Sequence, residues 1–432
     1  MKGRAIKMDN MTKVNLKELS DPKSIADAVF GIYVTQCIKG GSFPDSKAFF
    51  GIKFDDFNDA KKYEYTIDVG GEGGEKQDWV VIDTKSHKFV LCRDGSYVQF
   101  FNKKTGFNAR MGKDVDDDPS WCPLGPEIAD IEIVTGSCPK VNSENCRWCY
   151  KNNTSAAGKV MTLEQFKKVV ESFPKNLSQI ALGITGVKSN PYLKDMLKWL
   201  REVGIVGNLT LTGADLDDEM TDVLCEYCGA CAVSCYDKAK DLCYNTIKKL
   251  HDTAREKFNR NMSVNMHIVI ADFSMSHIMD VLNDIKDGKV PGLKSVVMLH
   301  AKPVGRAKNL DCSLSKENLT KVIKFCLDNN ISFGFDSCNG HNVQDILVEI
   351  GKSKLCTSIE PCESVRESIY CNVEGKITPC SFVEHVFEDS AIDMLNVDTK
   401  LVDVWTSNKM LNDFRNCVRC SKSCPIYALD CK

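Results

Sequence analysis

The chain has 432 residues, of which 43% are hydrophobic, and a formal net charge of −3 from 56 basic and 59 acidic side chains. This length and composition allow two or three domains with a sizeable core, and they exclude a disordered chain or a small scaffold held by disulfides. No dense basic run is present to bind a nucleic acid, although a neutral protein can still bind one locally.

The N-terminal sequence and the cysteine content predict a cytoplasmic protein without a membrane contact. Residues 1–20 hold no apolar segment typical of a signal peptide, and no run of about 18 apolar residues follows. In a reducing cytosol, clustered cysteines at C-x2-C spacing indicate metal ligands, whereas scattered ones indicate buried thiols. The scattered set is Cys37, Cys92, Cys122, Cys243, Cys312, Cys326 and Cys338.

Residues 1–125 predict a β-rich extension. A short helix comes first, and a turn at 94–96 joins two alternating runs into a hairpin. The strand-like runs lie at 49–54, 79–83, 88–92 and 97–101. An acidic, proline-containing stretch at 114–126 is interpreted as a linker.

Residues 126–340 predict alternating strands and helices. Strands are expected at 128–134, 180–184, 208–211, 230–236, 263–270, 295–299 and 331–335. Helices are expected at 162–173, 192–203, 217–227, 241–258, 276–287 and 316–329. Such repeated units imply right-handed crossovers and a parallel sheet or barrel, so the fold class is α/β. Catalytic groups of these folds lie at the carboxyl ends of the strands.

A cysteine triplet follows the first of these strands. Cys138, Cys146 and Cys149 form a C-x7-C-x2-C pattern. Three thiolates can hold a [4Fe–4S] cluster and leave one iron free to bind another molecule. The alternative is zinc, but a structural zinc site needs four closed ligands and no fourth cysteine follows nearby.

The strand, the loop ending Cys146-Arg147-Trp148-Cys149-Tyr150 and the six-unit alternation resemble the radical S-adenosylmethionine (SAM) superfamily. The resemblance implies a partial (β/α)6 barrel, similar to a TIM barrel, whose cluster binds SAM through the free iron. Reduction of the cluster then cleaves SAM to methionine and a 5′-deoxyadenosyl radical, which abstracts a substrate hydrogen. A flavodoxin- or ferredoxin-type reductant is also implied. The first gap of seven residues departs from the usual three.

The resemblance also implies SAM-binding residues outside the triplet. Trp148 is expected to pack on the adenine, and Tyr150 to cover the cluster. Thr185 and Gly186 follow the second strand, where the family usually carries Gly-Gly-Glu-Pro, so the glycine is kept and the acid is missing. Ser234 matches a serine that contacts the SAM carboxylate.

Residues 341–432 resemble the SPASM domain, a C-terminal module with auxiliary iron–sulfur clusters. Cys362-x12-Gly375-x4-Cys380 matches its hairpin, and Pro303-Val304-Gly305-Arg306-Ala307 matches a segment common in that subgroup. The implied auxiliary ligands are Cys356, Cys362, Cys371, Cys380, Cys417, Cys420, Cys424 and Cys431. One or two auxiliary clusters are expected, and the pattern leaves open whether all of them are closed by four thiolates or one keeps an open iron.

A second cysteine run, Cys225-x2-Cys228-x2-Cys231-x3-Cys235, has the spacing of a bacterial ferredoxin. This run covers a helix end and a buried strand, and Cys231 and Cys235 would lie on one strand face about 13 Å apart. We therefore predict buried thiols here rather than a cluster.

The SPASM resemblance implies a peptide or protein substrate. One alternative is radical modification of a nucleotide or a DNA or RNA base, and another, outside enzymes, is an iron–sulfur electron carrier. Ser381 stands where sulfatase-maturing relatives carry a catalytic Asp, which disfavours formylglycine formation.

Overall fold

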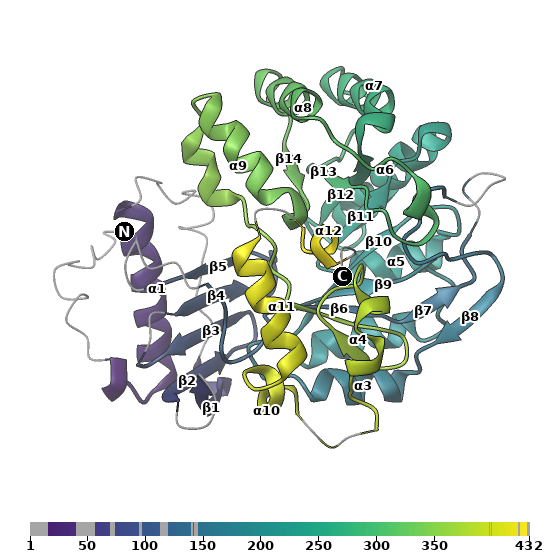
Figure 1. The fold of residues 1–432 in the computed structure, drawn as a ribbon. Helices are drawn as coiled ribbons and strands as arrows, with labels where there is room; N and C mark the ends of the chain where they lie inside the picture. Colours follow the sequence, from purple (N-terminus) through teal and green to yellow (C-terminus); the bar gives the residue numbers. More distant parts are fainter. Residues whose placement is uncertain are drawn as a thin grey trace.

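The computed structural model describes residues 16–39, 57–69, 74–94, 97–112, 120–139, 141, 146–396, 398, 400–421 and 424–429. Within these ranges the chain forms an antiparallel sheet near its start and a larger, mostly parallel sheet (Figure 1). A small hairpin is made by β7 (Val134–Gly136) and β8 (Ala157–Val160). The strand expected at 49–54 and Cys431 lie outside the described residues.

Five consecutive strands form the N-terminal sheet. They are β1 (Lys61–Val69), β2 (Glu75–Asp83), β3 (His87–Cys92), β4 (Val98–Asn102) and β5 (Asn108–Met111). Alternation along β2 directs Val80 and Ile82 toward helix α1 (Pro22–Lys39), and Trp79 and Val81 toward Leu124 on the opposite side. The β-rich extension is thus a sheet with apolar packing on both faces.

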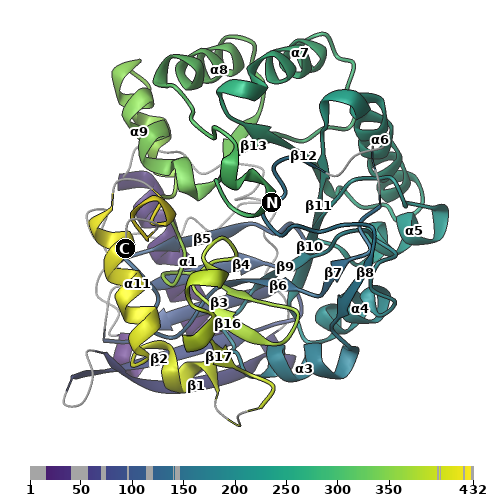
Figure 2. The ribbon, with the colours of Figure 1, turned by 45° about the vertical axis from the view of Figure 1, so that its right-hand side comes forward.

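Seven strands and six helices alternate in the second part of the chain. The strands are β6 (Ile128–Glu132), β9 (Gln179–Gly183), β10 (Val206–Leu211), β11 (Ala230–Ser234), β12 (Ser263–Ile270), β13 (Val296–His300) and β14 (Phe333–Phe335). The helices are α3 (Leu163–Glu171), α4 (Leu193–Glu202), α5 (Asp218–Tyr227), α6 (Lys240–Glu256), α7 (Met275–Lys286) and α8 (Lys316–Asp328). The strands pair in parallel in chain order, and the helices surround them (Figure 2). The predicted α/β fold is confirmed.

Local sequence signals set the ends of these elements. The hydroxyl of Thr162 accepts a hydrogen bond from the backbone of Gln165, whose side chain accepts from the backbone of Thr162, so α3 begins with a capping box. Gly204, with φ of +76°, follows the end of α4. Along β12 every second residue is buried, which gives the strand one face toward the helices and one toward the barrel interior.

The C-terminal segment continues the parallel sheet rather than standing apart from it. Its elements are α9 (Gly340–Glu349), β15 (Ser368–Cys371), β16 (Lys376–Thr378), β17 (Ile392–Asp393), α10 (Leu401–Trp405), α11 (Lys409–Cys420) and α12 (Ile426–Leu429). Strand β15 pairs in parallel with β6, so that Tyr370 lies opposite Asp130. Gly375, with φ of +77°, lies in the turn between β15 and β16. The sheet therefore runs across the boundary expected at residue 340.

Arg110 of β5 joins the three parts of the chain. Its Nη1 lies 3.2 Å from Glu127 at the start of the barrel, and its Nε lies 3.7 Å from Glu367 in the C-terminal segment. All three side chains are at least nine-tenths buried. Helices α10 and α11 lie in front of the junction of the N-terminal sheet and the barrel in Figure 1. The indole of Trp405 in α10 donates to the carbonyl of Cys122 at 2.7 Å.

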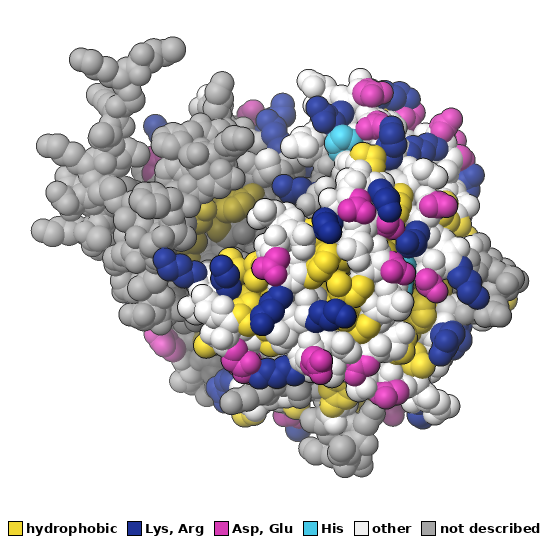
Figure 3. All heavy atoms as spheres, turned by 90° about the horizontal axis from the view of Figure 1, so that it is seen from above, with side chains coloured by type: hydrophobic (Ala, Val, Ile, Leu, Met, Phe, Trp, Pro, Cys, Tyr) yellow, Lys and Arg dark blue, Asp and Glu magenta, His cyan; other side chains and the backbone are white. Residues whose placement is uncertain are grey.

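The surface seen from above carries Lys and Arg side chains interspersed with Asp and Glu side chains (Figure 3). This mixture agrees with the near balance of charge in the sequence. Among the described residues, no helix has both the length and the apolar character needed to cross a bilayer.

Candidate active site

The loop that carries the cysteine triplet leaves the carboxyl end of the first barrel strand, as expected. The backbone N–H of Cys138 donates to the carbonyl of Thr154 at 2.9 Å. Further along, the N–H of Cys149 donates to the carbonyl of Cys146 at 3.3 Å. These bonds anchor the loop beside the β7–β8 hairpin and fold its second half into a turn.

The three thiols are close enough for the charge of one to act on another. Burial raises the pKa of Cys138, and the neighbouring Cys146 and Cys149 raise it further, while the Arg306 cation opposes them. Burial also raises the pKa of Cys146. Cys138 and Cys146 therefore favour their protonated form until a metal displaces the protons.

The three thiols of this loop have the donor chemistry of an iron–sulfur cluster. Within the part of the chain that the structure describes, no three His, Cys, Asp or Glu side chains converge on one metal-ion position. A cubane binds each thiolate through a different iron, so its ligands surround a larger volume. Three partly buried thiols on one anchored loop fit a [4Fe–4S] cluster that leaves one iron for another ligand.

Arg306 holds this loop from the far side of the barrel opening. Its backbone N–H donates to the carbonyl of Cys149 at 3.0 Å, and its Nε donates to the carbonyl of Cys146 at 2.8 Å. A third bond runs from its Nη2 to the carbonyl of Asn153 at 2.9 Å. The sequence singled out residues 303–307 only through a resemblance. In the structure, Arg306 of this segment clamps the cysteine loop with these three hydrogen bonds.

Gly305→Ala is expected to displace the cysteine loop. Gly305 has φ of +62°, and a Cβ there would lie 2.6 Å from the carbonyl oxygen of Cys149. The backbone strain is expected to lower the free energy of unfolding by about 1–3 kcal/mol. The collision is expected to shift the cysteine loop, so that the loop no longer holds a cluster. Gly351→Ala is the matched control, because Gly351 has φ of +73° and open space around it. Iron content and urea midpoints measure both variants, and equal iron in the two would contradict the clamp.

An aromatic stack lies beside the triplet. The ring of Trp148 stacks on Tyr236 at 6.2 Å and on Phe273 at 6.0 Å between centroids. The hydroxyl of Tyr236 is hydrogen-bonded to the side chains of Cys146 and Ser234, and burial raises its pKa. The structure thus brings Trp148 and Ser234 together, through Tyr236. Sequence reasoning missed this role of Tyr236, although an aromatic residue two positions after Ser234 was the available signal.

Tyr150 points away from this stack, toward the C-terminal segment. Its ring centroid lies 4.5 Å from that of Phe382, and its hydroxyl is hydrogen-bonded to Ser381. Its neighbour in the loop, Trp148, faces the barrel strands instead. The two aromatic residues of the loop therefore contact different parts of the molecule.

The loop after β9 packs against the cysteine loop at Gly186. A Cβ on Gly186 would lie 2.5 Å from Asp215 Oδ2 and 2.8 Å from Pro139. Two buried polar atoms here, Thr185 Oγ1 and Asp215 Oδ1, have no hydrogen-bond partner among the described residues. A buried polar atom without a partner costs about 1–3 kcal/mol, so both atoms are suited to a polar ligand. Sequence reasoning missed Asp215, which follows the next strand and brings an acidic side chain to this loop.

No family model matches the sequence, and no curated protein matches it. Among solved structures, SuiB of Streptococcus suis bound to the precursor peptide SuiA is similar over 71% of this chain and 71% of that one, with a TM-score of 0.53 and 12% identity. The chain has the radical SAM fold. SuiB bound to S-adenosylmethionine is similar over 69% of this chain and 71% of that one, with a TM-score of 0.53 and 12% identity. SuiB alone is similar over 68% of each chain, with a TM-score of 0.50 and 13% identity.

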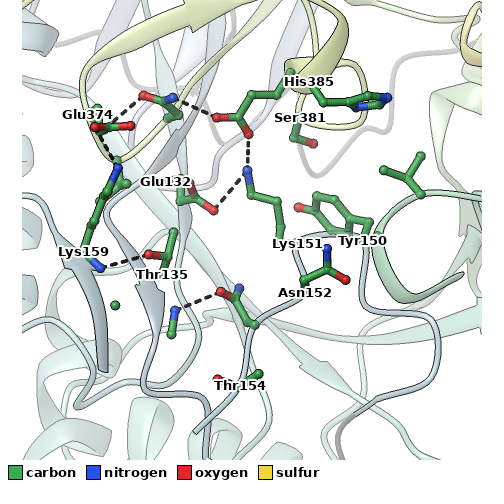
Figure 4. Close-up of a pocket in the computed structure, with 18 of the residues that line it drawn as sticks. Glu132, Thr135, Tyr150, Lys151, Asn152, Thr154, Lys159, Glu374, Ser381 and His385 are labelled. Atoms are coloured by element: carbon green, nitrogen blue, oxygen red, sulfur yellow. Dashed lines mark hydrogen bonds and ion pairs between the residues drawn. The ribbon is translucent and has the colours of Figure 1, made fainter. Parts of the chain in front are cut away.

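A cavity of about 1100 Å³ opens next to the cysteine loop of this radical SAM fold (Figure 4). In its wall, the Nζ of Lys151 lies 3.2 Å from Glu132, pairs with Glu384, and donates to the hydroxyl of Tyr370 at 2.6 Å. Burial raises the pKa of Glu132, against the opposing charge of Lys151. Burial, the largest single effect, raises the pKa of Glu384, but the hydrogen bond and charge of Lys151, with hydrogen bonds from Asn372 and Tyr370, together lower it. The cavity wall thus carries an ionised carboxylate beside a cation.

The C-terminal cysteines fall into separate places. Cys362, Cys380 and Cys424 lie with Cys338, which the sequence had grouped with the scattered thiols. The thiol of Cys356 instead donates to the carbonyl of Gln344 in α9, and that of Cys371 donates to the carbonyl of Asn372. Cys417 and Cys420 lie on α11. A ligand role stays a prediction for all eight of the cysteines that the resemblance implies, including Cys431.

The ferredoxin-like run in the barrel divides into two groups. Burial raises the pKa of Cys225, and Cys225 and Cys228 both act on Cys231. The thiol of Cys235 is hydrogen-bonded to Cys243 in α6 instead. The run therefore does not bring all four sulfurs into one group, as its position across a helix end and a strand predicts.

Proposed function

We propose that this chain is a radical SAM enzyme that modifies a peptide or protein side chain. The observation that carries the proposal is the position of the triplet, on a loop clamped by Arg306 and facing the buried polar atoms of Thr185 and Asp215. A [4Fe–4S] cluster on Cys138, Cys146 and Cys149 would supply the electron that cleaves SAM to methionine and a 5′-deoxyadenosyl radical, which abstracts a substrate hydrogen.

The residues around the triplet have separate roles in this proposal. The carboxylate of Asp215 and the hydroxyl of Thr185 accept hydrogen bonds from the SAM ammonium, in place of the missing motif acid. Trp148 offers a ring face to the adenine. Ser234 is oriented toward the triplet by Tyr236, whose hydroxyl contacts both Ser234 and Cys146. A flavodoxin- or ferredoxin-type protein would deliver the electron.

Two observations support a peptide as the substrate. The fold is shared with a SuiB structure that is bound to its precursor peptide SuiA. The cavity of about 1100 Å³ beside Tyr150 and Lys151 is larger than most pockets for small molecules. It is also lined jointly by the cysteine loop, the β7–β8 hairpin and the C-terminal segment, which leaves room for an extended chain.

Asp215→Asn is expected to weaken SAM binding by 10- to 100-fold, from the loss of a charged hydrogen bond worth about 1.5–3 kcal/mol. Asp217→Asn is the control: Asp217 lies in the same loop, is exposed, pairs with Lys188, and caps α5, where Asn caps equally well. The measurement is the change that SAM causes in the electron paramagnetic resonance signal of the reduced protein, titrated with SAM. Equal affinities of the two variants would remove Asp215 from the SAM site.

A further inference from the structure

Cys338 lies near three other cysteines, each from a distant segment of the chain. Cys338 follows β14, Cys362 precedes β15, Cys380 follows β16, and Cys424 precedes α12. The thiols of Cys338 and Cys424 are hydrogen-bonded to each other. The charge of Cys338 also acts on Cys362 and Cys380, whose pKa values are raised mainly by burial.

Backbone contacts hold these segments together independently of the thiols. A Cβ on Gly340, two residues after Cys338, would lie 2.5 Å from the carbonyl oxygen of Glu360 and 2.8 Å from Pro361, just before Cys362. The hydroxyl of Ser364 donates to the carbonyl of Pro379, which joins the residues next to Cys362 to those next to Cys380. Cys338 is therefore built into the C-terminal site by close packing.

Cys356, the ligand that the sequence pattern favours, is held elsewhere. Its thiol donates to the carbonyl of Gln344 at 3.6 Å. The side chain of Gln344 in turn donates to the carbonyl of Ile359 at 2.9 Å, which fixes the turn containing Cys356 against α9.

A buried cation lies beside Cys338 and Cys424. Lys302 has a fully buried side chain, and its Nζ lies 2.9 Å from Asp336 and 5.3 Å from the ring centroid of Phe382. These neighbours lie two residues from Cys338 and Cys380. The charge of Lys302 acts on both Cys338 and Cys424. A buried lysine with one carboxylate partner suits a site that carries further negative charge, such as a cluster bound by four thiolates.

We propose that Cys338, Cys362, Cys380 and Cys424 together bind and close the auxiliary [4Fe–4S] cluster, with Cys338 in place of Cys356, and that Lys302 balances its charge. The proposal rests on the proposed function and takes the kind of cluster from the SPASM resemblance, whereas the choice of ligands rests on the geometry. A cluster closed by four thiolates has no open iron, so it can exchange electrons and cannot ligate a substrate.

The test uses the full chain with Cys138, Cys146 and Cys149 replaced by Ala, so that SAM chemistry plays no part. In this background, Cys338→Ser is expected to lower the iron content of anaerobically reconstituted protein by up to about four atoms and to change its visible spectrum. Cys356→Ser is the matched control and is expected to keep both the iron content and the visible spectrum. Loss of iron in Cys356→Ser with full iron in Cys338→Ser would overturn the assignment, as would a Cys338–Cys424 disulfide in the iron-loaded protein.

A second measurement keeps the proposal testable if Cys338→Ser folds poorly. Lys302→Met removes a positive charge beside the cluster and is expected to lower its reduction potential. Asp336→Asn removes a negative charge, keeps an acceptor for the backbone N–H of His300, and is expected to raise the potential. Unchanged potentials in both variants, measured by potentiometric titration in the same background, would contradict the placement of the cluster beside Lys302.

Discussion

Replacing Cys138, Cys146 and Cys149 together with Ala is expected to remove one of the clusters and to abolish SAM cleavage. The three thiols are carried by one loop, which is anchored to Thr154 on one side and to Arg306 on the other. Without them no iron can be presented to SAM, while the cysteines after residue 337 keep their own positions. The iron content should therefore fall by about four atoms per chain, from about eight or more.

The control for this experiment is Cys326→Ala. Cys326 is a buried thiol of α8 and packs in the apolar core, so its loss is expected to leave all the iron in place. Iron and sulfide analysis together with SAM turnover measure both proteins. Full iron and SAM cleavage by the triple variant would show that the loop is not the catalytic centre.

The second large effect is expected from Arg110→Met, which should lower the free energy of unfolding of the chain. Arg110 lies between the buried carboxyl groups of Glu127 and Glu367, which come from the barrel and the C-terminal segment. Removing one partner of a buried ion pair typically costs about 3–5 kcal/mol, because the remaining charge stays buried. Lys409→Met is the control, since Lys409 is 87% exposed and pairs with Asp413 on the surface. It should cost under about 1 kcal/mol.

The loss caused by Arg110→Met should depend on pH. Burial raises the pKa of Glu367 from 4.5 to about 7, and Arg110 limits this rise. A carboxyl group with a raised pKa in the folded state binds more protons there than when unfolded, so its contribution to stability falls as the pH rises from 4.5 to about 7. Without Arg110 the pKa of Glu367 is higher still, so the fall in stability extends to higher pH. Urea unfolding should show a larger deficit at pH 8 than at pH 6, and a deficit independent of pH would contradict this account.

The sequence predicted the barrel well because its strands and helices are specified locally. Thr162 caps α3, Gly204 follows α4, and the alternation along β12 needs no knowledge of distant residues. The pairing of β15 with β6 was not foreseen, because it joins segments about 240 residues apart through contacts that no local pattern encodes.

The candidate site was predictable in its triplet and less so in the residues around it. Cys138, Cys146 and Cys149 share one loop, so spacing alone groups them. Asp215 and Arg306 reach that loop from other strands of the sheet, and their contacts follow from the barrel geometry.

In the assignment that we propose, Cys338 shows the limit of spacing as a guide. It lies 24 residues before Cys362 in the sequence and was taken for a buried thiol, while the nearer Cys356 matched the expected pattern. Which thiol reaches the auxiliary site then depends on how α9 packs. Gly340 packs closely on the residues before Cys362 and so brings Cys338 near, whereas Gln344 holds the thiol of Cys356 against α9.

The most direct test of the central claim is the reductive cleavage of SAM by the intact protein. Anaerobically reconstituted protein is mixed with dithionite and SAM, and 5′-deoxyadenosine and methionine are quantified by chromatography. We expect both products in equal amounts, with none formed by the triple alanine variant. A protein that holds its full iron, accepts electrons from dithionite and leaves SAM intact would be an electron carrier and would contradict the proposed function.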